Sequence, residues 1–229
     1  MPGTASGPRA TARTAAPRRR RLARVKAVFF DIGETLIDET RLWTGEAERA
    51  GISPLVLFAA LGALIERGAD HRQIWELVGV ERPSPPLLLN RSDLYDDALP
   101  CLEQLACDGY LVGLAGNQPE GVAEVLEEIG LPVAVVASSA RWGVEKPSPE
   151  FFRRIAHAAR MPPGEIAYVG DRLDNDVLPA RAAGLFAIFI RRGPWGFLHA
   201  GRPEVVQADA RVGSLLEISG LLRERPARA

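Results

Sequence analysis

The feature that most constrains this chain is a series of short apolar runs, separated by helical patterns. Most of the runs do not alternate apolar and polar residues, which is typical of strands covered on both faces. We therefore predict an α/β fold in which a parallel sheet lies between two layers of helices, joined by right-handed crossovers. The runs are rich in Val, Ile and Phe and occupy residues 25–30, 110–115, 133–137, 166–169 and 186–190, with a weaker sixth around Val205 and Val206.

Three helical patterns lie between the later runs. The first places apolar residues on one face and stops at Gly130. The second begins at Ser148 and Pro149, a pairing of cap residue and first-turn proline. The third spans about residues 176–183 and ends at Gly184. Strands that alternate with helices in this way support the parallel sheet.

Residues 39–93 break this alternation, because they contain no convincing strand. Ser53 and Pro54 predict the start of one helix, whose apolar residues form a single face. Asp70 and Gln73 form a capping-box start for a second helix. We interpret this segment as a small helical cap inserted after the first strand, between residues 25–38 and 94–229 of the core.

The net charge of −1 hides an asymmetry. Residues 1–26 contain eight Arg or Lys and no acid, so the rest of the chain has 20 basic and 29 acidic residues. An acidic body argues against a nucleic-acid partner. Residues 1–24 are rich in Ala, Pro, Thr and Arg, and we interpret them as a disordered basic tail. A nucleic-acid arm and a transit peptide are the other interpretations of the tail.

Membrane and redox signals are weak. No apolar run approaches the roughly 20 residues that a membrane-spanning helix needs, so we expect no membrane partner. Cys101 and Cys107, the only cysteines, are six residues apart and match no metal-binding pair. A reducing compartment fits this pattern, and we predict a cytoplasmic protein.

Polar residues gather just after the predicted strands. Asp31 follows four apolar residues, and Gly116 with Asn117 follows the second run. In open parallel sheets, ligands bind at the carboxyl ends of the strands. A carboxylate at such a place must be paired, metal-bound or catalytic, because a bare buried charge is too costly. Alone, Asp31 could equally cap the following turn.

Asp171 and Asp176 strengthen the functional interpretation of Asp31. Both lie just after the run at residues 166–169. Together with Asp31 and Asn117 they place polar residues after three strands, whose ends would converge on one crevice. Three carboxylates repel each other unless a cation neutralises them. Hard oxygen ligands favour Mg²⁺, which keeps positions for water and a phosphate.

Lys146 supplies the opposite charge. The chain has 26 Arg and only two Lys, so a lysine here is unexpected from composition. Its compact ammonium can contact both an aspartate and a phosphate oxygen. By itself, an exposed loop lysine before Pro147 would be the simpler interpretation.

Together these residues resemble the four ordered motifs of the haloacid dehalogenase-like hydrolase superfamily. The GDxxxND form at the fourth motif is the most specific of them, and the resemblance covers roughly residues 25–220. Short motifs are individually hypotheses, but four in order at strand ends are hard to obtain by chance. The matching segments are residues 30–36, Asn117, residues 145–149 and residues 170–176.

The resemblance implies a Rossmann-like core and a Mg²⁺-dependent phosphatase of small phosphorylated metabolites. Asp31 would be the nucleophile that forms an aspartyl-phosphate. The metal would be held by Asp31, the backbone carbonyl of Gly33, and Asp171 and Asp176 of the last motif. Lys146 would stabilise the phosphate and orient Asp31.

Two departures from the family pattern concern catalytic side chains. The family usually has a second Asp two residues after the nucleophile, acting as general acid and base, where this chain has Gly33. General acid–base help contributes typically ~10²–10⁴-fold, so Glu34 or Asp38 would have to substitute. Gly116 stands where a Ser or Thr usually binds phosphate, and Asn117 could compensate.

Two other functions stay open at this point. One is a haloacid dehalogenase, since dehalogenases of the family also lack the second Asp. They work without a metal, however, and Asp171 and Asp176 are intact. The other is a binding or regulatory protein that keeps phosphate affinity but turns over little. Several residues of the predicted cap could contact a substrate, although a surface or core role is favoured for each of them. They are Arg41, Trp43, Arg49, Arg72 and Trp75. The segment 191–196 could line the same crevice or be a surface turn.

Overall fold

A six-stranded parallel sheet organises the computed structural model, which describes residues 24–224. The predicted α/β class is confirmed. The strand order is β3-β2-β1-β4-β5-β6, so the chain starts in the middle of the sheet and builds outward on both sides. The strands are β1 (Ala27–Phe30), β2 (Leu111–Gly116), β3 (Val135–Ser138), β4 (Ile166–Gly170), β5 (Phe186–Ile190) and β6 (Ala210–Val212).

The strand predicted around Val205 and Val206 is wrong. These residues lie in a 3-10 helix, Pro203–Gln207, where Val205 packs into the core and Val206 is 74% exposed. The sixth strand is β6, a short edge strand in which only Val212 is buried. An edge strand covered so incompletely carries little of the apolar pattern that marks a buried strand.

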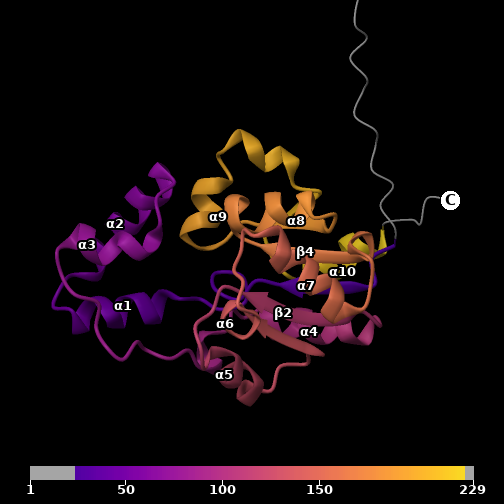
Figure 1. Cartoon of the computed structure of the whole chain (residues 1–229), viewed down its shortest axis with the longest axis horizontal. Helices are drawn as coiled ribbons and strands as arrows, with labels where there is room; N and C mark the ends of the chain where they lie inside the picture. Colours follow the sequence, from indigo (N-terminus) through magenta and orange to yellow (C-terminus); the bar gives the residue numbers. More distant parts are fainter. Residues whose placement is uncertain (1–23, 225–229) are drawn as a thin grey trace, which may run out of the picture.

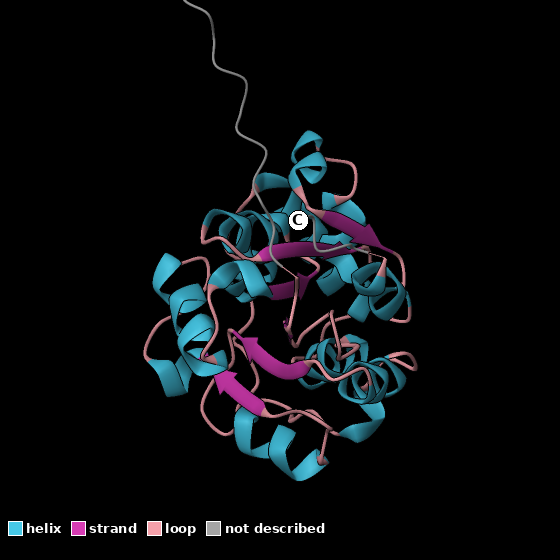
Figure 2. Ribbon diagram, turned by 90° about the vertical axis from the view of Figure 1, so that its right-hand side faces the viewer, coloured by secondary structure: helices cyan, strands magenta, loops and turns pink. Residues whose placement is uncertain are grey.

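Helices cover both faces of the sheet, as Figure 2 shows. Successive side chains of β1 point to opposite faces, so Val28 and Phe30 pack in one core and Ala27 and Phe29 in the other. The first core includes α4 (Ala98–Cys107), α5 (Val122–Ile129) and α10 (Glu217–Arg223). The second includes α7 (Pro149–Ala159) and α8 (Leu178–Ala182).

Two of the three predicted core helices have the expected ends. Helix α5 ends before Gly130, which adopts φ +72°, and α7 begins after Ser148, whose hydroxyl accepts a hydrogen bond from the N–H of Glu150. The helix predicted from residue 176 begins earlier, as a π-helical turn (Leu173–Val177) that runs into α8. Short helices α6 (Ser139–Trp142) and 3-10 turn Pro163–Glu165 complete the core connections.

The segment 39–93 is helical, and it stands to one side of the sheet in Figure 1. Its ends lie side by side, because the N–H of Asp38 donates to the carbonyl of Asp93 at 2.7 Å. The segment has its own apolar core, to which α9 (Gly193–His199) contributes Trp195. Its helices are α1 (Thr40–Arg49), α2 (Pro54–Arg67) and α3 (Ile74–Val78), with 3-10 turns at His71–Gln73 and Arg91–Asp93.

The start predicted at Asp70 differs in detail. The Asp70 carboxylate accepts from the N–H of Arg72 and begins the 3-10 turn, and α3 follows only at Ile74. Helix α1 has no counterpart in the sequence-based expectation. The predicted tail at residues 1–24 lies outside the described residues apart from Arg24.

Among residues 24–224 no single helix is long and apolar enough to cross a bilayer, although α1 and α2 would reach that length and composition together across a 117° bend.

Candidate active site

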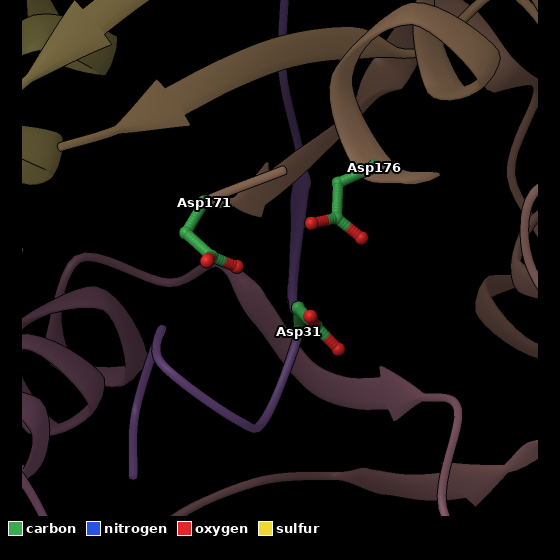
Figure 3. Close-up of side chains that lie close together, drawn as sticks. All are labelled: Asp31, Asp171 and Asp176. Carbon is green, nitrogen blue, oxygen red and sulfur yellow. The ribbon is translucent and has the colours of Figure 1, made fainter. Parts of the chain in front are cut away.

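Three buried aspartates meet at the carboxyl ends of β1 and β4. Asp31 directly follows β1, Asp171 directly follows β4, and Asp176 comes from the π-helical turn after β4. Figure 3 shows the three side chains gathered at these strand ends. One carboxylate oxygen from each lies within 4.8 Å of the other two. The convergence that the sequence predicted for these three residues is therefore present in the structure.

Lys146 completes the cluster. Its Nζ lies 2.7 Å from Oδ1 of Asp31 and 2.6 Å from Oδ1 of Asp176. The lysine side chain is 1% exposed, so this is a buried ammonium rather than a loop lysine in solvent. The ammonium fixes how two of the three carboxylates are oriented.

The charges of the cluster shift each other's ionisation. Burial, with the neighbouring Asp176 and Asp31, raises the pKa of Asp171 well above its ordinary value. Burial raises the pKa of Asp176 to about 6, although Lys146 opposes that shift. Burial alone would lower the pKa of Lys146, but Asp176 and Asp31 more than offset it and hold that pKa above its usual value.

The turn after β4 brings Asp176 close to the end of that strand. An ideal Cβ on Gly170 would lie 2.5 Å from Cβ and Cγ of Asp176, so any larger residue at 170 would displace the carboxylate. The second oxygen, Oδ2, accepts from the N–H of Arg172 at 3.0 Å. The wider π-helical turn thus folds the Asp176 side chain back toward the end of the strand.

The donor set fits a hard divalent cation. Asp171 Oδ2 is buried and no donor in the described part of the chain hydrogen-bonds to it, which is costly for a carboxylate oxygen. Three carboxylates and one ammonium would leave a net charge of −2 when all are ionised. Oxygen ligands of this kind and charge suit Mg²⁺.

Asn117 holds the loop that carries Lys146. Its Oδ1 accepts from the N–H of Lys146 at 2.7 Å, and its Nδ2 donates to the carbonyl of Lys146 at 2.9 Å. Gly116 acts through its missing side chain, because an ideal Cβ there would lie 2.7 Å from Oδ1 of Asp31. Both residues therefore make room for, or position, the groups of the cluster.

A cavity of about 1200 Å³ opens above the cluster, between the sheet and the helical segment 39–93. Asp31, Gly33, Lys146 and Asp171 line it from the core side. From the helical segment, Trp43, Arg72 and Trp75 line it, as the sequence allowed. Arg41 instead pairs with Asp93 at 2.6 Å, and Arg49 is exposed.

The segment 191–196 also reaches the cavity. Trp195 of α9 is buried and lines it, in edge contact with the His71 ring at 5.4 Å between centroids. The Arg172 guanidinium lies 4.9 Å from the centre of the Trp195 ring. Two core segments distant in sequence thus meet the helical segment at this wall of the cavity.

The two carboxylates that the sequence offered as substitute acid or base are differently placed. Glu34 lines the cavity, but Oε2 accepts from the Tyr95 hydroxyl at 2.7 Å and Oε1 from the N–H of Glu39 at 3.3 Å. Burial raises the pKa of Glu34 to about 6, against the opposing Tyr95 hydrogen bond. Asp38 accepts from the N–H of Thr40 and lines a separate cavity.

Glu39 is a cavity carboxyl group that the sequence reasoning missed. It is partly buried, and its Oε2 accepts from the indole N–H of Trp43 at 3.1 Å. An ideal Cβ on Gly33 would lie 2.9 Å from Cδ of Glu39 and would overlap Oε1. Burial and the neighbouring Glu34 raise the pKa of Glu39 to about 7. The glycine at position 33 was the available signal, since it left space for a carboxyl group from elsewhere.

Comparison with known proteins places this chain among hydrolases. The family model described as haloacid dehalogenase-like hydrolase matches residues 25–184. The glyceraldehyde 3-phosphate phosphatase of Methanopyrus kandleri is 30% identical, over 75% of this chain and 86% of its own length.

Solved structures that share the fold include a phosphatase and a dehalogenase. A haloacid dehalogenase-like phosphatase from Thermococcus onnurineus is 25% identical with a TM-score of 0.58, covering 86% of this chain and 98% of its own. The L-2-haloacid dehalogenase of Xanthobacter autotrophicus has a TM-score of 0.63 at 18% identity, covering 88% of this chain and all of its own. The latter likeness shows the fold alone.

Proposed function

The chain belongs to the haloacid dehalogenase-like hydrolase family, and from that premise we propose that it is a Mg²⁺-dependent phosphatase of small phosphorylated metabolites. The observation that carries the proposal is the buried cluster of Asp31, Asp171 and Asp176, with Lys146 paired to two of them. The phosphatase relative from Methanopyrus kandleri supports the choice of substrate class.

In the proposed reaction an oxygen of Asp31 attacks phosphorus and the bond from phosphorus to the leaving oxygen breaks. Water then attacks phosphorus of the aspartyl-phosphate, which releases inorganic phosphate and restores the Asp31 carboxylate. A carboxylate nucleophile splits one difficult displacement into two easier ones. Lys146 holds Asp31 in place and faces the negative charge of the transferring group.

Asp31, Asp171, Asp176 and the backbone carbonyl of Gly33 would hold Mg²⁺ at this edge of the sheet. The cation would neutralise phosphoryl charge and the mutual repulsion of the carboxylates. Asn117 contributes by fixing the backbone of Lys146, and Gly116 by leaving space for Asp31. Residues 39–93 would act as the cap over the cavity and carry most of the substrate selectivity.

Two alternatives make different use of the same residues. Cleavage of a carbon–halogen bond needs the nucleophile but no metal, so it leaves the unpartnered oxygen of Asp171 unexplained. A regulatory protein would bind Mg²⁺ and phosphate with little turnover. We also infer a cytoplasmic location, in agreement with the free thiols of Cys101 and Cys107.

The test is hydrolysis of p-nitrophenyl phosphate by the whole chain with Mg²⁺, compared with Asp31→Asn. Asp96→Asn, an exposed aspartate, is the matched control and should keep wild-type turnover. We expect turnover that disappears in Asp31→Asn and on removal of Mg²⁺ by a chelator. Equal, slow hydrolysis by wild type and Asp31→Asn would contradict the proposal and favour the regulatory alternative.

A further inference from the structure

The carboxyl group of Glu39 lies where a side chain on residue 33 would otherwise be. Its Cδ is 2.9 Å from the ideal Cβ position of Gly33, and Oε1 is nearer still. Gly33 is the second residue after Asp31, and Asp31, Gly33 and Glu39 line the same cavity. A carboxyl group carried by the helical segment thus enters the space beside the nucleophile that the glycine leaves open.

The proposed reaction needs a proton donor and acceptor in this space. When the bond from phosphorus to the leaving oxygen breaks, the electron pair goes to that oxygen, which departs more easily as an alcohol than as an alkoxide. The attacking water must in turn lose a proton. One carboxyl group can serve both steps, giving its proton in the first and taking one in the second.

The two carboxyl groups nearest to Asp31 along the chain, those of Glu34 and Asp38, already accept hydrogen bonds from within the fold. Both oxygens of Glu34 accept, one from the Tyr95 hydroxyl and one from the N–H of Glu39. Asp38 accepts from the N–H of Thr40 and lines a separate cavity. For Glu39, in contrast, the described residues provide one donor, Trp43, and it binds Oε2 and leaves Oε1 toward Gly33.

Trp43 acts as the positioning residue for this carboxyl group. Its indole N–H lies 3.1 Å from Oε2 of Glu39, and its ring packs against the apolar core of the helical segment. Glu39 directly precedes α1, and Trp43 lies in the first turns of that helix. The start of α1 therefore fixes where the carboxyl group sits relative to Gly33.

We propose that Glu39 is the general acid and base of the phosphatase reaction, taking the place of a side chain at residue 33. This inference rests on the proposed function. In the first step the Glu39 carboxyl gives its proton to the leaving oxygen as Asp31 forms its bond to phosphorus. In the second, the Glu39 carboxylate takes a proton from the attacking water, which restores both residues.

The experiment compares two aryl phosphates of nearly the same shape, p-nitrophenyl phosphate and phenyl phosphate, at saturating Mg²⁺. Nitrophenolate leaves readily without a proton, whereas phenolate is more basic and benefits from one. The value of kcat/KM reports the step in which the leaving group departs. Wild type, Glu39→Gln and the control Glu48→Gln are compared, since Glu48 is an exposed carboxylate on the same helix.

We expect Glu39→Gln to lower kcat/KM for phenyl phosphate by roughly 10²–10⁴-fold and to lower that for p-nitrophenyl phosphate far less. Glu48→Gln should match wild type on both. Trp43→Phe, which removes only the indole donor, should show a smaller loss with the same preference between substrates. The p-nitrophenyl phosphate activity of each preparation also reports whether the protein has folded.

A second variant tests the place of the carboxyl group rather than its identity. Gly33→Asp combined with Glu39→Ala returns a carboxyl group to the same space and should recover part of the phenyl phosphate activity that Glu39→Ala loses. Gly33 does not adopt a left-handed φ, so an aspartate meets no backbone strain there.

The outcomes separate the two proposals. If wild type shows no Asp31-dependent hydrolysis of either substrate, the proposed function fails and the role of Glu39 with it. If Asp31-dependent hydrolysis is present but Glu39→Gln is as active as wild type on phenyl phosphate, the role of Glu39 alone is overturned. Equal losses on both substrates would also overturn it, because they indicate a structural effect.

Discussion

Lys146 and Asp176 form an ion pair that solvent barely reaches. Nζ lies 2.6 Å from Oδ1, and the two side chains are 1% and 0% exposed. The same ammonium also pairs with Asp31, so one positive charge restrains the proposed nucleophile and one proposed metal ligand together. Lys146 therefore contributes both to the stability of the cluster and to its proposed chemistry.

Removing the ammonium should therefore affect activity and stability at once. We expect Lys146→Met to lower kcat for p-nitrophenyl phosphate by roughly 10²–10³-fold, the usual loss of a fixed charge at a developing anion. Breaking the buried pair should also lower the free energy of unfolding by about 3–5 kcal/mol. Steady-state kinetics and urea unfolding measure the two effects. Lys146→Arg, which keeps the charge, should recover some stability without full activity, and a Lys146→Met protein as active as wild type would contradict the assignment.

Substitution of Asp171 should have opposite effects on stability with and without Mg²⁺. Without Mg²⁺, Asp171→Asn removes a carboxyl group whose ionisation is opposed by burial and by two neighbouring aspartates, so the variant should be at least as stable as wild type. With Mg²⁺, the variant has lost a ligand, and the rise in unfolding temperature on adding the cation should shrink. Thermal unfolding of both proteins, with and without Mg²⁺, measures this difference. An equal rise in both would show that Asp171 does not bind the metal.

The stabilisation by Mg²⁺ should also grow with pH. Burial raises the pKa of Asp176 to about 6, above its unfolded value of about 4. A raised pKa stabilises the metal-free fold at low pH, and that stabilisation is lost as pH rises through about 6. Protons compete with the cation for the carboxylates. We expect a smaller rise in unfolding temperature at about pH 5 than at about pH 7.5, and a pH-independent rise would contradict the assignment.

His199, which lies outside the acidic cluster, should make the free energy of unfolding depend on pH. Burial lowers its pKa to about 4, and its Nδ1 accepts from the N–H of Leu173 at 3.0 Å, which requires the neutral ring. Because the unfolded ring takes up a proton near its ordinary pKa of about 6.5, stability falls as pH drops below that value. His199→Asn keeps an acceptor but does not titrate.

The difference in unfolding free energy between wild type and His199→Asn isolates the contribution of His199. Between about pH 7.5 and pH 5, wild type should lose about 1–2 kcal/mol more unfolding free energy than the variant. Urea unfolding at both pH values measures it, since contributions from the other titrating groups are common to the two proteins. Parallel losses would show that His199 is not a neutral acceptor in the fold.

The sequence predicted the elements that are buried on both faces. Strands such as β5 have apolar residues throughout. Asp31 and Asp171 directly follow strands β1 and β4, and Asp176 lies in the turn after β4, so their convergence could be inferred from the order of motifs. The edge strand β6 and helix α1 were missed. The former has one buried residue, and the latter is polar on average with little buried surface of its own.

Glu39 could not be found from local sequence because its role depends on a turn. Glu34 adopts φ 52° and accepts from the N–H of Glu39, and together these features fold residues 34–39 back over Gly33. Sequence distance favoured Glu34 and Asp38, which lie nearer to Asp31 along the chain. Which carboxyl group enters the space above a glycine is decided by that turn and by the Trp43 hydrogen bond, and neither has a sequence signature.

The most direct test of the account is to look for the phosphorylated nucleophile. Wild-type protein is mixed with p-nitrophenyl phosphate and Mg²⁺, quenched in acid within the first turnovers, digested and analysed by mass spectrometry. We expect a phosphoryl group on the peptide that contains Asp31, removable by hydroxylamine and absent from Asp31→Asn. Turnover that proceeds without any phosphorylated protein, or with the phosphoryl group on another residue, would contradict it.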